Sequence, residues 1–243
     1  MFFNVFIFWG LTNLILFCPQ GVFLLRGNEE NSPPKVVITK PVATTRLPWN
    51  SIVPYSIHVN DREDGNSEYD EIPRGQVLLL VNYFPKAIEV KTYLDQGRDK
   101  MPEPLVQMSK STCLICHTSK AKLIGPSFDL IAGRYNGKDP GQVDALAQKI
   151  ISGSKGTWGE LIMPPHPDLE IGQVKRMVSW ILEHGANPNQ SFYTGTEGAF
   201  RTVEKTVGEA GIYTLTASYS DHGLNNLPNS SLQGRHTIAI SPE

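Results

Sequence analysis

The stretch Cys113-Leu-Ile-Cys-His117 (CLICH) holds two of the chain's three cysteines and one of its six histidines within five residues. Three kinds of chemistry use two thiols spaced as C-x-x-C. They are a dithiol redox centre, half of a zinc site and, when a histidine follows at once, the covalent attachment of haem c. The rest of the sequence therefore has to decide between these three sites.

The residues around CLICH give little support to the first two sites. A thioredoxin-like motif follows a strand in a βαβ unit, whereas residues 101–112 (MPEPLVQMSKST) are typical of a helix start with a proline in its first turn. A structural zinc site needs two further ligands at close spacing, and no cysteine follows Cys116. On a helix, Cys113, Cys116 and His117 face one side, where the thiols can bind the porphyrin edge and the imidazole the iron. The sequence therefore predicts haem c.

A second axial ligand has to come from elsewhere, and Met163 is the predicted one. It lies in the run LIMPPHP, which indicates an irregular loop stiffened by prolines. Met101 and Met108 precede CLICH on the same predicted helical stretch, and Met177 belongs to an apolar helical stripe. His166, on the same loop as Met163, is the alternative ligand, and two histidines would lower the potential that a methionine raises.

Helix signals continue between and beyond the two predicted ligands. Ser127 is an expected N-cap, Asp139 is another with Pro140 at the first helical position, and a last helix is expected over about residues 168–184 with Glu170 in its first turn. Four short helices are thus expected around one flat ring.

With these residues in place, residues 101–186 resemble a small bacterial class I cytochrome c, and residues 153–167 (GSKGTWGELIMPPHP) are similar to the methionine loop of that family. The chain departs from the family's pattern at His166, where such loops often carry Asn. The resemblance implies one set of residues around haem c: Cys113 and Cys116 as thioether attachment points, His117 and Met163 as axial ligands, the Pro126 carbonyl as acceptor for the other ring N–H of His117, and Trp158 beside a haem propionate.

The flanks contain short β-branched and aromatic runs between turn residues, three on each side of the cytochrome-like segment. Three strands alone do not make a comfortable sandwich, and both flanks resemble pieces of one bacterial immunoglobulin-like or PKD-like module. We therefore expect an α+β multidomain chain, in which an all-α class I cytochrome c domain at residues 101–186 is inserted in one β-sandwich made of residues 33–94 and 190–243. Two independent small β-domains are the alternative.

Two further segments carry signals of their own. Residues 1–27 contain no charged side chain before Arg26, which fits a cleaved signal peptide, a retained membrane anchor or a misplaced start. Cys18 lies in this segment and is expected to be one more apolar residue in it. The acidic segment at residues 61–71 offers oxygen atoms that suit calcium, but it lacks EF-hand spacing and is expected to be a solvated turn.

Composition and the haem prediction together limit the function. A formal net charge of −2 and a charged content of 19% give no basic surface for nucleic acid. A haem with two protein ligands has no open position, so one-electron transfer rather than enzymatic catalysis is expected, in the periplasm or cell envelope. The alternatives are a haem enzyme or sensor with a labile methionine, and a surface-binding β-module. The combination of modules resembles the tail regions of quinoprotein sugar dehydrogenases, which implies a dehydrogenase as electron donor and a respiratory-chain acceptor.

Overall fold

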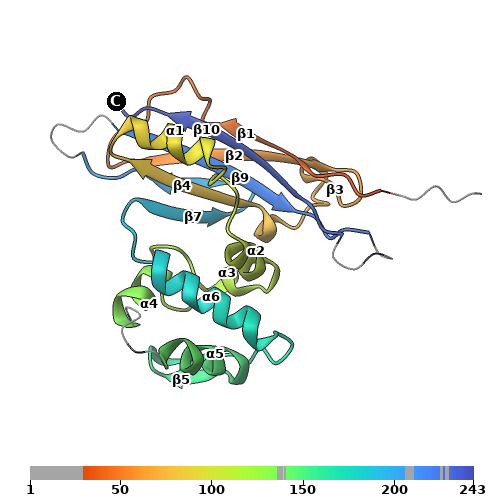
Figure 1. Cartoon of the computed structure of the whole chain (residues 1–243), viewed down its shortest axis with the longest axis vertical. Coiled ribbons are helices and arrows are strands. Elements are labelled where there is room, and N and C mark those ends of the chain that lie inside the picture. The colour runs from red at the N-terminus through yellow and green to blue at the C-terminus, as the bar shows by residue number, and fades with distance from the viewer. Residues whose placement is uncertain (1–29, 136–138, 140, 206–210, 225–226, 228–229) are drawn as a thin grey trace, which may run out of the picture.

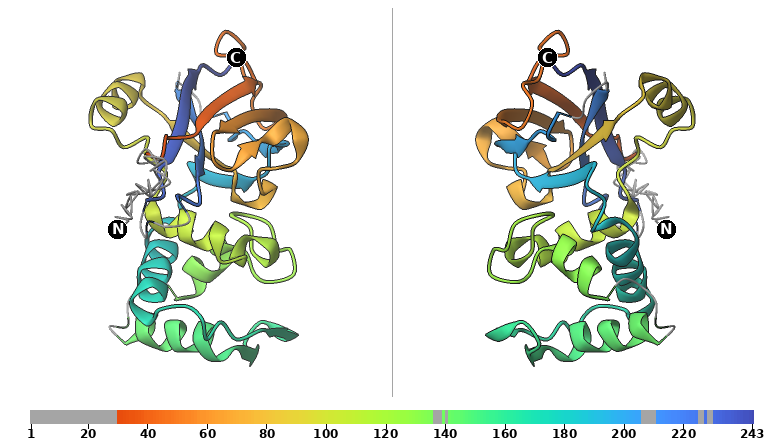
Figure 2. Two further views of the ribbon diagram at one scale, coloured as in Figure 1. Left: turned by 90° about the vertical axis from the view of Figure 1, so that its right-hand side faces the viewer. Right: turned by 90° about the vertical axis from the view of Figure 1, so that its left-hand side faces the viewer.

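The computed structural model describes residues 30–243 except 136–138, 140, 206–210, 225–226 and 228–229. The described chain forms two regions, which Figures 1 and 2 show at opposite ends of the molecule. The β-region comprises residues 30–95 and 190–243, and the helical region comprises residues 101–186. The predicted leader at residues 1–27, including Cys18, lies outside the described residues.

Two four-stranded antiparallel sheets form the β-region. In the first sheet the order is β1 (Lys35–Lys40), β2 (Ile52–Asp61) and β3 (Gly65–Asn66), and β8 (Glu197–Arg201) also pairs with β2. In the second sheet the order is β10 (Gln233–Ile240), β9 (Ile212–Ser220), β4 (Leu78–Phe84) and β7 (Gln190–Thr194). Each sheet therefore contains strands from both flanks of the helical region.

Alternating side chains from the two sheets meet in one hydrophobic core, because successive residues of a strand point to opposite faces. Buried residues of β2, such as Tyr55 and Ile57, pack in the same cluster as Leu79 of β4, Leu215 of β9 and Phe200 of β8. The two flanks of the helical region therefore share this core.

Strand β4 is buried on both faces. Leu79 and Val81 point into the core between the sheets, whereas Leu78 and Leu80 belong to a second cluster. That cluster joins the β-region to the helical region, since it also contains these residues: Phe192 of β7, Met101, Leu105, Val106, Met108, Leu114, Phe128, Met177, Trp180 and Ile181. An apolar run buried on two sides needs no polar alternation, which explains the sequence LLLVNYF.

Five helices and one hairpin make up the described helical region. They are α2 (Glu103–Lys110), α3 (Cys113–Cys116), α4 (Phe128–Tyr135), α5 (Gln142–Ser152), the hairpin of β5 (Ser154–Gly156) and β6 (Gly159–Met163), and α6 (Ile171–His184). A third apolar cluster, containing Ala147, Val174 and Val178, packs α5 against α6. None of the helices in the described part of the chain is long and apolar enough to cross a membrane.

One α-helix and two short 3-10 helices accompany the strands of the β-region. Helix α1 (Ala87–Asp95) follows β4 and contacts both β4 and β9, and the 3-10 helices η1 (Ser67–Tyr69) and η2 (Arg74–Gln76) lie between β3 and β4. Tyr93 of α1 accepts a hydrogen bond at its hydroxyl from Asn82 of β4 and packs on Phe84. Helix α1 therefore covers part of the outer face of the second sheet (Figure 1).

The six strands expected from the flanking sequences are present as β1, β2, β4, β8, β9 and β10. Strands β3 and β7 and helix α1 were not expected. Strand β7 is short and follows directly after the helical region. The sequence predicted only that the second half of the β-region begins there, at residue 190. The likeness of the β-region to an immunoglobulin-like or PKD-like module stays a prediction.

Several local predictions were wrong. Met101 and the CLICH motif are not on one helix, because Thr112 has a left-handed backbone (φ 61°) that separates α2 from α3. Helix α5 begins at Gln142 with Gly141, not Asp139, as its N-cap. Glu170 is the N-cap of α6 and accepts from the amides of Gly172 and Gln173, rather than lying in the first turn.

The acidic segment is also less solvated than expected. Asp61 is only 5% exposed, and the side chain of Asp64 is only 12% exposed. At the end of β2, the side chain of Asp61 accepts hydrogen bonds from the amides of Glu63 and Asp64, and Asp64 in the following turn accepts from the Tyr219 hydroxyl and the His222 amide.

Removing residues 191–243 tests the shared core of the two sheets. This truncation deletes both neighbours of β4 and the Phe200 and Leu215 side chains that pack on β2. Residues 30–95 should then lose cooperative unfolding, measured by far-ultraviolet circular dichroism during heating. A sharp unfolding transition of the remaining strands would show that the first half has a core of its own.

Candidate haem-binding site

The CLICH motif occupies a single helical turn and the residue that follows it. Helix α3 runs from Cys113 to Cys116, and the His117 amide donates to the Cys113 carbonyl over 3.1 Å. His117 itself leaves the helix with an extended backbone (φ −119°, ψ 136°). The prediction that all three groups lie on one helix was therefore wrong for His117, although the two cysteines lie one turn apart.

The ring of His117 is oriented by a main-chain carbonyl. Its Nδ1 atom lies 2.7 Å from the carbonyl oxygen of Pro126, and this predicted contact is present. A carbonyl can only accept, so Nδ1 carries the proton and donates it. The other ring nitrogen, Nε2, therefore has a free lone pair, which is the arrangement found for histidines that bind metals.

Two neighbours fix the position of the His117 ring. Gly125 lies so close that a Cβ atom there would be 2.4 Å from Cε1 and 2.8 Å from Nδ1 of His117. The Gly125 amide donates to the Cys116 carbonyl over 2.9 Å, which holds this segment against the motif. On the other side, the Phe128 ring is stacked with the imidazole at a centroid distance of 5.9 Å. The ring is thus held between a glycine and an aromatic side chain.

Burial determines the protonation of the site. It lowers the pKa of His117, against the opposing effect of the Pro126 carbonyl, and the positive charge that His166 can carry lowers that pKa further. Burial also raises the pKa of the Cys113 thiol to about 11. At neutral pH the imidazole is neutral and the Cys113 thiol stays protonated in the chain alone.

A cavity in the helical region brings most of the predicted residues together. Its wall contains Cys113, His117, Pro126, Trp158 and Met163, but not Cys116. The remaining wall is largely apolar and comes from α2, α4, α5, the β5–β6 hairpin and α6; its side chains include Met108, Phe128, Ile131, Leu146, Ile150, Leu161, Met177, Val178, Ile181 and Leu182. Lys149 and Lys155 add two cationic groups to this wall.

Met163 reaches the cavity from the end of a hairpin rather than from an irregular loop, so that local prediction was wrong. It pairs with Ser154 at the open end of β5 and β6. Gly153, just before β5, has a left-handed backbone (φ 77°), and a Cβ atom on it would lie 2.9 Å from the Met163 carbonyl oxygen. Glycine there allows the close approach that carries Met163 to the cavity wall.

The other candidate ligands have different surroundings. Met108 and Met177 also line the cavity, but they are 1% and 2% exposed and belong to the apolar cluster beneath β4. His166 does not line the cavity, and its amide donates to the carbonyls of Ile150 and Ile151 at the end of α5. The side chain of Trp158 lies under the guanidinium of Arg134 at 4.8 Å from the ring centroid.

Sequence reasoning missed the residues that position His117 from outside the motif. Gly125 was not singled out, although a glycine before Pro126 is a signal of close backbone approach. Phe128 and Phe192 were not identified because their contact, with ring centroids 5.4 Å apart, joins the helical region to strand β7. No local pattern reports a contact between residues so far apart in the chain.

The residues that line the cavity fit haem c. A histidine with its Nδ1 already engaged and a methionine line one largely apolar cavity, whose wall also carries a cysteine and two lysines. Soft sulfur and imidazole ligands suit haem iron, and lysines suit its carboxylates. Cys116 lies one helical turn from Cys113, at the spacing that haem c attachment requires.

Comparisons with known proteins point to one kind of protein. The chain is 37% identical over 78 residues to cytochrome c-551 of Allochromatium vinosum, a match that spans 32% of this chain and 82% of that protein. It is 42% identical over 72 residues to cytochrome c-551 of Azotobacter vinelandii, spanning 30% and 85%. The crystal structure of Nitrosomonas europaea cytochrome c552 covers 31% of this chain and 93% of that chain, with 37% identity and a TM-score of 0.30. No protein-family model matches the chain.

Gly125→Ala tests how tightly the His117 ring is held. The added methyl group would collide with the imidazole, so we expect a loss of about 1–3 kcal/mol in the free energy of unfolding and a shift of the His117 Nδ1 proton signal. Thermal unfolding and NMR measure the two effects. Gly133→Ala is the matched control, because a Cβ atom there meets nothing within 4 Å in helix α4 and alanine favours a helix. Equal effects of the two substitutions would contradict the close packing of Gly125.

Proposed function

Because the chain belongs to the class I cytochrome c family over about a third of its length, we propose that it transfers single electrons through a covalently bound haem c with His117 and Met163 as axial ligands. Cys113 and Cys116 form the thioether bonds. The observation that carries this proposal is the His117 ring, whose Nδ1 proton is engaged by Pro126 and which lines the same cavity as Cys113 and Met163.

Met163 is proposed as the second axial ligand by comparison with the other candidates, which are two methionines and His166. Met108 and Met177 are nearly fully buried in the apolar cluster that joins the two regions, so using either as a ligand would disrupt packing. Met163 lies on the cavity wall at the end of β6 and is followed by two prolines that limit its backbone. His166 is excluded from that wall. Met163 is therefore the side chain best placed to complete the coordination.

Haem c supplies a metal centre that cycles between two oxidation states, and two protein ligands leave no position on it for a substrate. The chain's own residues then act on binding and orientation. Pro126 fixes the His117 tautomer, Phe128 and Gly125 fix the ring position, and the apolar wall excludes water. Lys149 and Lys155 are available to pair with the haem carboxylates. Trp158 would pack beside those carboxylates. These features describe a carrier rather than an enzyme.

The electron donor we propose is a dehydrogenase of the periplasm or cell envelope, such as a sugar dehydrogenase, with a respiratory-chain component as acceptor. The support is chemical, because a one-electron carrier needs a partner that releases electrons one at a time. Haem c attachment would also place the protein in the same compartment as a dehydrogenase of the periplasm or cell envelope. The β-region would then hold the haem near its partner, as a spacer or docking module. An N-terminal leader or anchor would supply the export this location needs.

Covalent attachment predicts that the haem survives denaturation. When the matured protein is treated with acidified acetone, the haem should stay with the precipitated chain, because thioether bonds at Cys113 and Cys116 do not depend on folding. Absorption spectra of the pellet and the supernatant measure the distribution. The Cys113→Ala, Cys116→Ala double variant is the control and should release its haem into the solvent. Release from the native sequence would contradict covalent attachment.

Replacing the proposed axial methionine should change both spectrum and potential. Met163→Ala should abolish the weak red absorption band of methionine–iron ligation, lower the reduction potential and let the reduced protein bind carbon monoxide. His166→Ala is the matched control on the same loop and should leave all three properties close to those of the native protein. The opposite pattern would assign the ligand to His166, and carbon monoxide binding by the unaltered protein would favour an enzyme or sensor with a labile methionine.

A further inference from the structure

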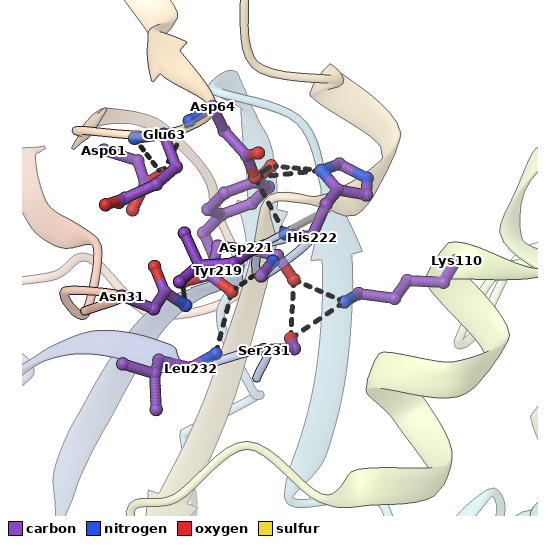
Figure 3. Close-up of polar contacts among 12 residues, drawn as sticks. Asn31, Asp61, Glu63, Asp64, Lys110, Tyr219, Asp221, His222, Ser231 and Leu232 are labelled. Atoms are coloured by element: carbon purple, nitrogen blue, oxygen red, sulfur yellow. Dashed lines mark hydrogen bonds and ion pairs between the residues drawn. The ribbon is translucent and has the colours of Figure 1, made fainter. Parts of the chain in front are cut away.

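A second cluster of polar groups lies far from the haem cavity, where three distant segments of the β-region meet. Asp61 is the last residue of β2, Asp64 lies in the turn between β2 and β3, Asp221 directly follows β9, and Asn31 precedes β1. Asp61 is 5% exposed and Asp221 is fully buried. Figure 3 shows these side chains together, with Glu63 beside Asp61.

Most oxygens of this cluster have donors. The side chain of Asp221 accepts from the amides of Gly223 and Leu232 with Oδ1, and from Nδ2 of Asn31 with Oδ2 over 2.9 Å. Asp64 Oδ2 accepts from the Tyr219 hydroxyl over 2.7 Å and from the amide of His222 over 3.0 Å. Asp61 Oδ1 accepts two amides of its own turn. Each of these carboxyl groups is thus fixed in position by at least two donors.

Two buried oxygens of the cluster are left without a donor. Oδ2 of Asp61 and Oδ1 of Asn31 are both buried, and neither has a hydrogen-bond partner among the described residues. A buried acceptor without a partner costs about 1–3 kcal/mol, and an ionised one costs more. A positive group beside Asp61 would offset this cost.

No side-chain cation of the described residues supplies it. Lys110 enters from helix α2 on the side away from Asp61 and Asn31 (Figure 3), where its Nζ atom donates to the Asp221 carbonyl over 2.8 Å and to Ser231 Oγ over 3.2 Å. His222 is half exposed and lies 2.9 Å from Asp64 Oδ2. Lys110 and His222 thus compensate other parts of the cluster.

We propose that Asp61 Oδ2, Asn31 Oδ1 and the Asp221 carboxylate bind a calcium ion. Calcium takes six to eight oxygen ligands, and it accepts carboxylates and amide carbonyls in an irregular arrangement, whereas magnesium requires a near-ideal octahedron.

This donor set differs from a cluster of acidic residues alone. Among the described residues, no group of three or more His, Cys, Asp or Glu side chains is gathered as a metal site. The proposed site has two carboxylate ligands, Asp61 and Asp221. Its third side-chain ligand is the amide oxygen of Asn31, and asparagine is not one of those four residue types. The two unpartnered buried oxygens, rather than the number of carboxylates, identify it.

Calcium at this position would link three segments that are far apart in the sequence. They are the chain before β1, the β2–β3 turn and the loop between β9 and β10. Lys110, three residues before Cys113, hydrogen-bonds to the last of these segments. Calcium would therefore stabilise both the β-region and its contact with the helical region.

The test uses the matured full-length protein after removal of metal with a chelator. Calcium chloride should bind one ion per chain in isothermal titration calorimetry, and millimolar calcium should raise the unfolding temperature. Asp61→Asn should weaken binding by about tenfold or more and remove the thermal response. This variant should fold, because the amide oxygen of asparagine can still accept the hydrogen bonds that Asp61 Oδ1 accepts from the amides of Glu63 and Asp64. Asn31→Ala, which removes the second unpartnered oxygen, should weaken binding as well.

Asp70→Asn is the matched control. Asp70 lies in the same acidic segment, but its side chain is 68% exposed and pairs with Arg74. This variant should bind calcium as the native protein does. The proposal is overturned if millimolar calcium leaves the native unfolding temperature unchanged. It is also overturned if Asp61→Asn responds to calcium as strongly as the native protein.

Discussion

The two-sided burial of β4 is the constraint on which the rest of the structure depends. Leu79 and Val81 close the core between the two sheets, and Leu78 and Leu80 lie under the helices. A strand with apolar residues on both faces is stable only when both faces are covered. The helical region therefore serves as part of the packing of the second sheet, and the two regions bury a common hydrophobic cluster instead of being joined only by a linker.

The position of the helical region in the chain suits this packing. Helix α1 and the helical region together form the connection between β4 and β7, which are antiparallel neighbours, and the Tyr83 amide donates to the Asn189 carbonyl where the chain returns. Because this connection begins and ends on neighbouring strands, it takes the place of a hairpin turn, and the entropy of closing such a loop grows only slowly with its length. Phe192 of β7 then contacts Phe128, which stacks on His117. The β-region thus reaches the predicted haem ligand through two aromatic rings.

The parts of the structure that could be predicted from the sequence are those set by neighbouring residues. The spacing of Cys113, Cys116 and His117, the Pro126 contact and the six β-branched strands all depend on short stretches, and each is present. The break at Thr112 was missed because a left-handed threonine is unusual and no local sequence signal marks one. Strand β7 was missed because its partner β4 lies more than a hundred residues earlier, and only that pairing makes QSFYT a strand.

The two sites of this protein also differ in whether neighbouring or distant residues build them. The residues of the haem cavity lie within one continuous segment, so a motif and its spacing are enough to reveal them. The acidic cluster joins Asn31, Asp61 and Asp221, whose sequence separation reaches 190 residues. In the sequence its central element resembles a polar turn, because Asp61 and Asp64 lie in an acidic segment and Gly65 follows Asp64. Only the pairing of β2 with β1, and the packing of one sheet on the other, buries these carboxyl groups and leaves two oxygens without donors. A polar site built from distant segments is thus recognised by the buried atoms that lack a hydrogen-bond partner. A sequence pattern does not show which atoms these are.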